Sequence, residues 1–484
     1  MSPINESALK TPGVYVFEIP SFPPSIAQVA TAIPAFIGYT EHDTDSKGTS
    51  WNLKPKRITS LLDYQQIFGG AGLETNFKLN ILEHHDSAGK LTSADVNAAF
   101  SGTPSTTYLL YYAVQMYFMN GGGPCYIVSV NTYATGGGTV SDGDLQKGLN
   151  AIKPQDEPTL IVFTEGQKVA TAVAYYTLQN NALELCAKLQ DRFSLIDIYD
   201  NGSDTETNAN TFRGNPIPAN GIGANNLNYG AAYYPNLITT LSYAYDNTLV
   251  PLTITVAGGG TAVLTSTTSG DLFKENKVVY NQGISALNSV GVELAPASII
   301  AGVMATVDAT RGVWKAPANV SLNGVQGLKD NITDASQADL NIDTTAGKSI
   351  NAIRAFTGKG ILVWGARTLD GNSNDFRYVS VRRFFIMVEE SVKKAAMQFV
   401  FEPNDGNTWV RIRAMIENYL TNLWRLGALA GSKPEQAFYV KVGLGQTMTF
   451  DDILNGKMIV EIGMAPVRPA EFIILRFSQI QQQA

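Results

Sequence analysis

An alternation of strand-like and helix-like segments limits most strongly what this chain can fold into. Residues 108–120, "YLLYYAVQMYFMN", have a helical pattern that ends at three glycines, and the strand-like run 125–130 follows. Residues 159–163, 174–190 and 193–200 then repeat the order strand, helix, strand. Because parallel strands need helical crossovers, this order predicts a parallel α/β layer.

The length of the chain predicts several domains, because 484 residues exceed what one hydrophobic core normally holds. The expected class is α/β, with a multidomain α+β organisation. We expect seven parts in the following order: an N-terminal extended arm (1–24), a strand with variable loops (25–106), the first part of an α/β middle domain (107–199), a surface insertion (200–268), the second part of the middle domain (269–370), a C-terminal domain (371–465) and a C-terminal extended arm (466–484).

Two amphipathic helices mark the C-terminal domain. Apolar residues recur every three or four positions in both, at Phe385, Val388, Val392, Ala395 and Phe399 in the first and at Trp409, Ile412, Ile416, Leu420 and Leu423 in the second. Strand-like segments follow the second helix, so this domain is expected to be α+β.

Two further strand-like segments, "TPGVYVFEIPSFPP" and "PAEFIILRFSQ", lie near the two ends of the sequence. Both faces of each segment carry apolar side chains, and prolines keep the segments extended. One interpretation is that each strand completes a sheet within its own subunit. We favour pairing with other copies of the chain, through Val14, Tyr15, Val16, Phe17 and Ile19 and through Phe472, Ile473, Ile474, Leu475 and Phe477.

Composition argues against several classes of function. The net charge of −7 argues against nucleic acid as a partner. No stretch approaches the roughly 18 unbroken apolar residues of a membrane span, so direct membrane insertion is not expected. The N-terminal residues lack the pattern of a signal peptide, which predicts assembly in the cytoplasm. Charged residues make up only 16%, which fits either a surface rich in Ser, Thr and Asn or a surface covered by other subunits.

A search for catalytic and binding motifs predicts no catalytic, cofactor-binding or metal-binding residue. The three histidines, His42, His84 and His85, all lie in an early polar region, and "EHHD" is more typical of a solvated loop than of a metal site. "AGKS" ends like a phosphate-binding loop at Gly347, Lys348 and Ser349. The glycine that such a loop requires five places before Gly347 is Ile342, so no phosphate cradle is expected.

Three segments resemble the sheath proteins of contractile phage tails and related injection systems. These are "TPGVYVFEIPSFPPSIAQVATAIPAFIG", "INAIRAFTGKGILVWGARTLD" and the long run from "YVSVRRFFIMVEES" through "FEPND" to "LWRLGALAG". The resemblance covers roughly residues 11–38 and 340–478. It is weak between them, and the role of residues 200–268 stays open.

The resemblance implies a structural subunit without catalytic activity. Such a subunit polymerises helically around an inner tube through exchanged arm strands, and contracts from a metastable extended state to drive the tube through a target envelope. Its expected partners are further copies of itself, the inner tube protein, and baseplate and terminal cap proteins. Its final location would be a phage tail or a tail-like particle, including particles released outside the cell. The middle domain of the family is similar in fold to subtilisin but has no catalytic site.

The C-terminal domain would face the tube. Within it we assign tube contact to the basic side of the second amphipathic helix, at Arg411, Arg413 and Arg425, with ordinary solvated or intrachain charges as the alternative. Two other functions remain open at this point. One is a subtilisin-like hydrolase that uses one of the three histidines, and the other is a binding module that does not polymerise.

Overall fold

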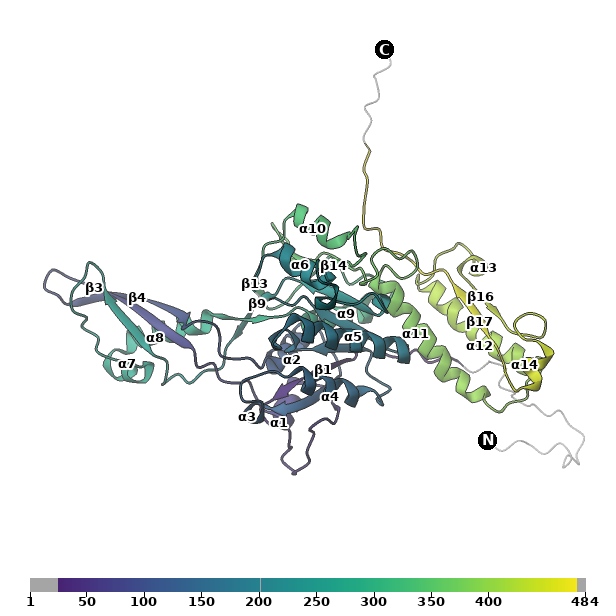
Figure 1. Ribbon diagram of the computed structural model, residues 1–484, viewed down its shortest axis with the longest axis horizontal. Coiled ribbons are helices and arrows are strands. Elements are labelled where there is room, and N and C mark those ends of the chain that lie inside the picture. Colours follow the sequence, from purple (N-terminus) through teal and green to yellow (C-terminus); the bar gives the residue numbers. More distant parts are fainter. Residues whose placement is uncertain (1–24, 201, 477–484) are drawn as a thin grey trace, which may run out of the picture. The chain divides into compact units, whose positions relative to one another are not determined.

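The computed structural model describes residues 25–200 and 202–476, which form two compact units (Figure 1). Among the described residues, the larger unit comprises residues 28–390, except residue 201, together with residues 466–476. The smaller unit comprises residues 391–465 with residues 25–27. The expected start of the C-terminal domain at residue 371 therefore lies 20 residues before this division (391 − 371 = 20).

A nine-stranded sheet forms the centre of the larger unit, in the order β12-β15-β14-β8-β7-β6-β1-β5-β2. Its inner strands are parallel: β1 (Pro34–Thr40), β5 (Cys125–Thr132), β6 (Leu160–Phe163), β7 (Phe193–Asp197), β8 (Gly230–Tyr234) and β14 (Ile350–Phe356). The edges are antiparallel: β2 (Lys56–Ile58), β12 (Val320–Ser321) and β15 (Gly360–Val363). The predicted parallel α/β layer is confirmed.

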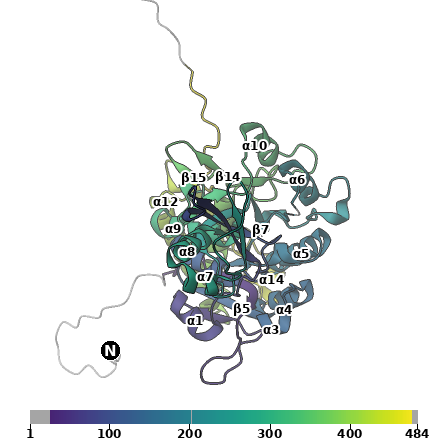
Figure 2. The same cartoon turned by 90° about the vertical axis from the view of Figure 1, so that its left-hand side faces the viewer.

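Helices cover both faces of this sheet (Figure 2). The ring of Phe36 on β1 packs against Tyr117 of α2 (Leu110–Met119), and α9 (Ala297–Arg311) packs against α2. The next residue, Ile37, lies against Gly148 of α4 (Asp142–Ile152), beside α5 (Ala172–Leu189). Since successive side chains of a strand point to opposite faces, α2 and α9 cover one face and α4 and α5 the other.

The prediction that residues 200–268 form a surface insertion is wrong for part of that segment. β8 lies inside the central sheet, between β7 and β14, and all five of its residues are buried. β9 (Leu237–Ser242) forms a second sheet with β11 (Gly291–Leu294) and β13 (Val325–Leu328). The sequence hid β8 because "GAAYYPN" lies in a region of Gly, Asn and Pro that is typical of loops.

The early region expected to be surface loops also contains regular structure. β3 (Phe77–His85) and β4 (Leu91–Phe100) form a long antiparallel hairpin, and β10 (Leu252–Val256) pairs with β3 in parallel. α7 (Ser269–Glu275) and α8 (Lys277–Ser289) pack beside this three-stranded sheet. Residues about 170 positions apart in the sequence thus build one module, with Ile81, Leu264, Leu272 and Val279 in its small core.

The larger unit also contains α1 (Leu61–Phe68), α3 (Tyr133–Gly136), α6 (Thr205–Arg213), α10 (Asp334–Asn341) and the short 3-10 helices η2 (Gly166–Lys168), η3 (Pro218–Asn220) and η4 (Leu227–Tyr229). α11 (Val379–Ala396) begins in the larger unit and ends in the smaller unit. The smaller unit adds η5 (Met397–Phe399), α12 (Gly406–Arg425), α13 (Pro434–Ala437), α14 (Phe450–Leu454) and a two-stranded sheet of β16 (Phe438–Lys441) and β17 (Glu461–Met464). The predicted apolar stripe of α12 is buried at Ile412, Ile416, Leu420 and Leu423, and half-buried at Trp409.

Candidate interaction surfaces

The segment expected to be the C-terminal arm is held to the larger unit at Glu471. Arg367 donates from Nε to Glu471 Oε1 at 2.9 Å and from a terminal nitrogen to Oε2 at 2.6 Å. Asn341 Nδ2 donates to Oε1 at 2.9 Å, and the Tyr378 hydroxyl lies 3.3 Å from Oε2. Burial opposes ionisation, but the hydrogen bonds from Arg367 and Asn341 outweigh it and hold the pKa of Glu471 below its usual value.

The four residues after Glu471 are exposed. Phe472, Ile473, Ile474 and Leu475 show 69%, 78%, 79% and 72% of their surface to solvent. They belong to no sheet among the described strands. Four consecutive apolar residues in extended backbone expose both side-chain faces and an unpaired edge. Phe477 lies outside the described residues, as do Val14, Tyr15, Val16, Phe17 and Ile19.

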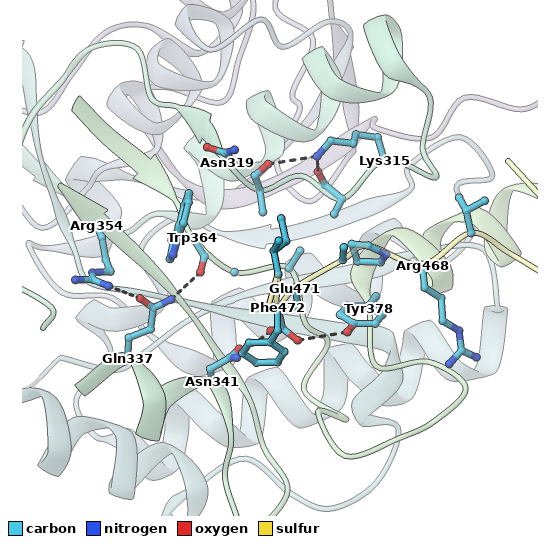
Figure 3. Close-up of a pocket in the computed structure, with 18 of the residues that line it drawn as sticks. Lys315, Asn319, Gln337, Asn341, Arg354, Trp364, Tyr378, Arg468, Glu471 and Phe472 are labelled. Carbon is cyan, nitrogen blue, oxygen red and sulfur yellow. Dashed lines mark hydrogen bonds between the residues drawn. The ribbon is translucent and has the colours of Figure 1, made fainter. Parts of the chain in front are cut away.

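A cavity of 880 Å³ lies beside this segment (Figure 3). Trp314, Trp364 and Phe472 supply aromatic surface, and Lys315, Arg354 and Arg468 supply positive charge. Lys315 Nζ donates to the carbonyl oxygen of Ala316 at 2.7 Å, and Arg354 donates to Asp334 and Gln337. Lys315 and Arg354 therefore already have partners in the chain.

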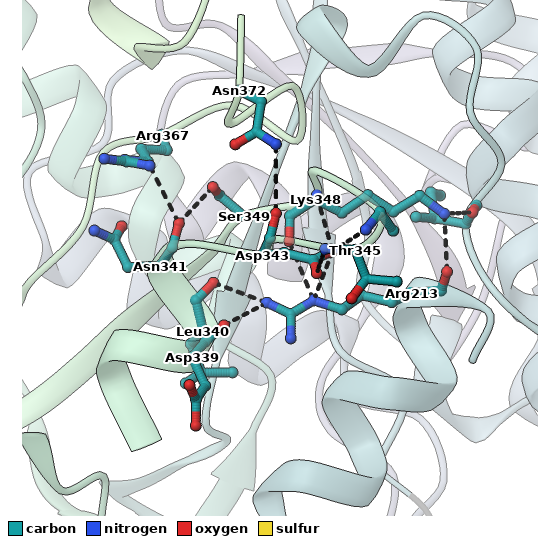
Figure 4. Close-up of polar contacts among 12 residues, drawn as sticks. Arg213, Asp339, Leu340, Asn341, Asp343, Thr345, Lys348, Ser349, Arg367 and Asn372 are labelled. Atoms are coloured by element: carbon teal, nitrogen blue, oxygen red, sulfur yellow. Dashed lines mark hydrogen bonds and ion pairs between the residues drawn. The ribbon is translucent and has the colours of Figure 1, made fainter. Parts of the chain in front are cut away.

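The motif that ends like a phosphate-binding loop belongs to a buried polar network (Figure 4). Lys348 Nζ donates to the carbonyl oxygens of Arg213 at 3.0 Å and Ile222 at 2.5 Å. The Asp343 carboxylate accepts from the backbone nitrogen of Lys348 and pairs with the Arg213 guanidinium. Burial lowers the pKa of Lys348. This lysine therefore bonds to carbonyl oxygens of its own chain and not to a phosphate.

The point where the strand order of the central sheet reverses lies between β1 and β6. Ligands of doubly wound sheets bind at such points, with anionic groups at a helix N-terminus. Here the Glu165 carboxylate accepts from the backbone nitrogens of Leu109 and Leu110, at the start of α2, and of Tyr39. Burial raises the pKa of Glu165 to about 7. A Cβ at Gly38 would collide with this carboxylate, so the chain itself fills the position of a ligand.

The sheet of the smaller unit has only two strands among the described residues. β16 and β17 pair only with each other among the described strands. Two-stranded sheets are marginal by themselves, and their outer edges offer unpaired backbone groups to a further strand. The smaller unit thus contains a candidate acceptor for an added strand.

The three arginines assigned to tube contact differ in their surroundings. Arg411 is 55% exposed, pairs with Glu402 at 3.4 Å and lies over the ring of Phe399. Arg413 donates to the carbonyl oxygen of Val442 at 2.8 Å, so it also supports its own unit. Arg425, at the end of α12, is exposed. Arg411 and Arg425 are therefore available to a partner, whereas Arg413 also has an internal role.

The histidines His84 and His85 lie on β3 and pair with carboxylates. His84 Nε2 is 2.8 Å from Asp95, and His85 Nε2 is 2.6 Å from Glu83. In the described part of the chain, no three His, Cys, Asp or Glu side chains gather as metal ligands would. Of the helices described, none has the length and apolar character needed to cross a membrane.

Comparison with known proteins gives a consistent result. A family described as the phage tail sheath C-terminal domain matches residues 372–480. The tail sheath protein of Vibrio phage KVP40 is 26% identical over 179 residues, and that of Burkholderia phage BcepMu 29% over 138 residues. These alignments cover 37% and 28% of this chain but only 25% and 28% of the two relatives.

Two solved structures match over nearly the full length. The sheath complex of the extracellular contractile injection system PVC, in its contracted state, is 31% identical, with a TM-score of 0.63 and 98% of each chain covered. The helical sheath of the anti-feeding prophage AFP, also contracted, is 32% identical, with a TM-score of 0.63, 98% of this chain and 100% of that chain covered.

Proposed function

This chain belongs to the family of sheath proteins of phage tails and phage tail-like contractile injection systems, and on that premise we propose that it polymerises helically around an inner tube and contracts to drive the tube through a target envelope. The observation that carries the proposal is the exposed apolar segment 472–475, whose four side chains are all exposed and which has no pairing partner among the described strands. Such a segment gains backbone and side-chain partners only when another chain supplies them.

The subunits would be joined by strand exchange. The segment 472–477 of one copy would add to the β16–β17 sheet of another, with residues 14–19 as a second donor strand. Each such joint would make about 4–6 backbone hydrogen bonds, each worth about 0.5–1.5 kcal/mol net. Because donor and acceptor are different surfaces, the contact is head-to-tail and propagates as a helical polymer.

The energy of contraction would be stored during assembly. The extended polymer would be metastable and separated by a barrier from a contracted form with different contacts between subunits. Two features support a mechanism without nucleotide: Lys348 is bonded to carbonyl oxygens, and Glu165 fills the reversal point of the sheet. Partners would be the tube, a baseplate and a terminal cap, with Arg411, Arg413 and Arg425 toward the tube.

The finer likeness of the middle domain to the subtilisin fold stays a prediction. A hydrolase would need a serine hydroxyl hydrogen-bonded to a histidine ring that a carboxylate also holds, and the ring contacts found for His84 and His85 are to the carboxylates of Asp95 and Glu83. A binding module that does not polymerise would elute as a single small species from a sizing column. A sheath subunit would form rods or short helical tubes.

Negative-stain microscopy of the recombinant chain, with and without residues 1–20 and 472–484, tests the proposal. We expect cylinders from the full chain and none from the truncated chain, which should stay folded as judged by circular dichroism. Intact cylinders from the truncated chain would overturn strand exchange. A full chain that stays monomeric in the presence of its tube and baseplate would overturn the sheath function itself.

A further inference from the structure

We propose that the ion pair between Glu471 and Arg367 is the mechanical anchor of the C-terminal arm: it fixes the residue at which the arm leaves the larger unit and passes the load on the arm into the central sheet. This inference rests on the proposed function, because an arm bears load only in an assembly. It assigns a positioning role to two residues, neither of which belongs to the exchanged strand.

Contact with the larger unit ends abruptly between Glu471 and Phe472. Arg367 is only 4% exposed and holds Glu471 through two nitrogens, whereas the next residue, Phe472, is 69% exposed. A bidentate Arg–carboxylate pair has a defined geometry as well as charge, so it fixes direction better than a single contact. The arm therefore starts at Phe472, and not at Pro466 or Pro469.

A continuous set of hydrogen bonds leads from the anchor into the sheet. The backbone nitrogen of Arg367 donates to Asn351 Oδ1 at 2.7 Å. Asn351 Nδ2 donates to the carbonyl oxygens of Arg367 at 2.8 Å and Ala232 at 3.0 Å. Asn351 lies on β14 and Ala232 on β8, both inside the central sheet. Tension on the arm would thus be shared by two buried strands.

The anchor also sets how far the arm can reach. Residues 466–470 precede Glu471, and Arg468 and Ala470 are exposed. If Glu471 were released, these residues would add slack of about 17 Å, at about 3.3–3.6 Å per extended residue. Slack of that size corresponds to a shift of about five residues along a strand, at about 3.3 Å per residue, enough to lose the register of an exchanged strand.

A buried arginine also holds the chain near the described N-terminal residues, at Thr31. A terminal nitrogen of Arg383 donates to the carbonyl oxygen of Thr31 at 2.7 Å, and the Thr31 hydroxyl donates to Asp308 at 2.6 Å. Arg383 and Asp308 also form a buried ion pair. A buried arginine therefore holds the chain near each end of the larger unit, at Thr31 and at Glu471.

The test places flexible inserts on the two sides of the anchor. One variant carries Gly-Ser-Gly-Ser-Gly between Val467 and Arg468, upstream of Glu471, and the other carries it between Glu471 and Phe472. With the anchor intact, the upstream insert should leave the critical concentration for cylinder formation within twofold of the unmodified chain. The downstream insert should raise it about tenfold or more, because the added residues must be ordered on assembly.

Loss of the anchor should remove the difference between the effects of the upstream and downstream inserts on the critical concentration. In chains with Glu471→Gln, which keeps the shape of the side chain, the upstream insert should become as harmful as the downstream one. Asp334→Asn is the matched control, because it neutralises a carboxylate that is 95% exposed and paired with Arg354 nearby. Thermal unfolding of unassembled chains verifies that each variant is folded.

Each outcome has one meaning. Equal effects of the two inserts in the unmodified background would overturn the anchor, and so would an asymmetry that survives Glu471→Gln. If the unmodified chain forms no cylinders with tube and baseplate present, the proposed function fails first, and that result is distinct from a symmetric response in a chain that does assemble.

Discussion

The Oε1 atom of Glu165 lies 2.8 Å from the backbone nitrogen of Leu110, the first residue of α2. A second buried carboxylate repeats the arrangement, since Asp197 Oδ1 accepts from the backbone nitrogen of Ala297, the first residue of α9, at 2.8 Å. Both carboxylates lie at the carboxyl ends of parallel strands, where doubly wound enzymes bind anionic ligands. The backbone nitrogens at two helix N-termini thus donate to carboxylates of the same chain. This arrangement suits a rigid scaffold better than a binding site.

Asp197 should make the stability of the larger unit depend on pH. Burial raises its pKa from 3.8 to about 7, so between these values the folded state binds more protons than the unfolded state. The free energy of unfolding should therefore fall as pH rises from about 4 to 7, by up to about 4 kcal/mol. Asp197→Asn should reduce this slope in urea unfolding of the unassembled chain, and the remaining slope should come from Glu165, whose pKa burial also raises to about 7. An unchanged slope in the variant would show that Asp197 is not the titrating group.

Ile474→Asp should abolish cylinder formation without affecting the unassembled chain. The side chain is 79% exposed, so the substitution costs nothing in the monomer, but a charge in an exchanged strand would be buried without a partner. Negative-stain microscopy and thermal unfolding measure the two effects. Val278→Asp on α8 is the control, since Val278 is 69% exposed and lies outside the proposed joint. Cylinders from the Ile474 variant, or loss of them in the control, would contradict the assignment.

The sequence predicted the regular core of the fold and missed what depends on distant pairing. α2, α5 and α12 have the expected periodicity, because burial of one face imposes it locally. β8 was missed because its short run has no alternation and its neighbours are about 35 and 115 residues away in the sequence. The sequence predicts Glu471 only as part of a strand, since nothing in the local pattern points to Arg367, 104 positions earlier.

Substitutions of the three arginines of α12 should have different effects on tube binding and on folding. Arg411→Glu and Arg425→Glu should give polymers that lack tube, because both side chains are exposed and reversal of their charge would remove the charge complementarity that the proposed tube contact needs. Arg413→Glu should in addition lower the stability of the smaller unit by about 1–3 kcal/mol, through loss of its bond to the Val442 carbonyl. Electron microscopy shows whether the polymers contain tube, and circular dichroism measures folding. Tube-filled particles from the double variant Arg411→Glu, Arg425→Glu would refute the tube contact.

Lys348→Met should destabilise the larger unit without any effect that depends on nucleotide. The substitution keeps most of the apolar stem but leaves the carbonyl oxygens of Arg213 and Ile222 without their donor, at a cost of about 2–4 kcal/mol. Lys359→Met is the control, because Lys359 is exposed in the turn between β14 and β15 and should have almost no effect.

Thermal unfolding with and without Mg-ATP decides between the two roles of Lys348. A phosphate-binding lysine would give the unmodified chain an increase in melting temperature with ATP that the variant loses, because a ligand that binds only the folded state stabilises it. A lysine that joins the segment before β14 to the segments containing Arg213 and Ile222 gives no such increase in either chain. Protection by ATP that requires Lys348 would therefore contradict both the structural role and the proposal that contraction draws only on energy stored at assembly.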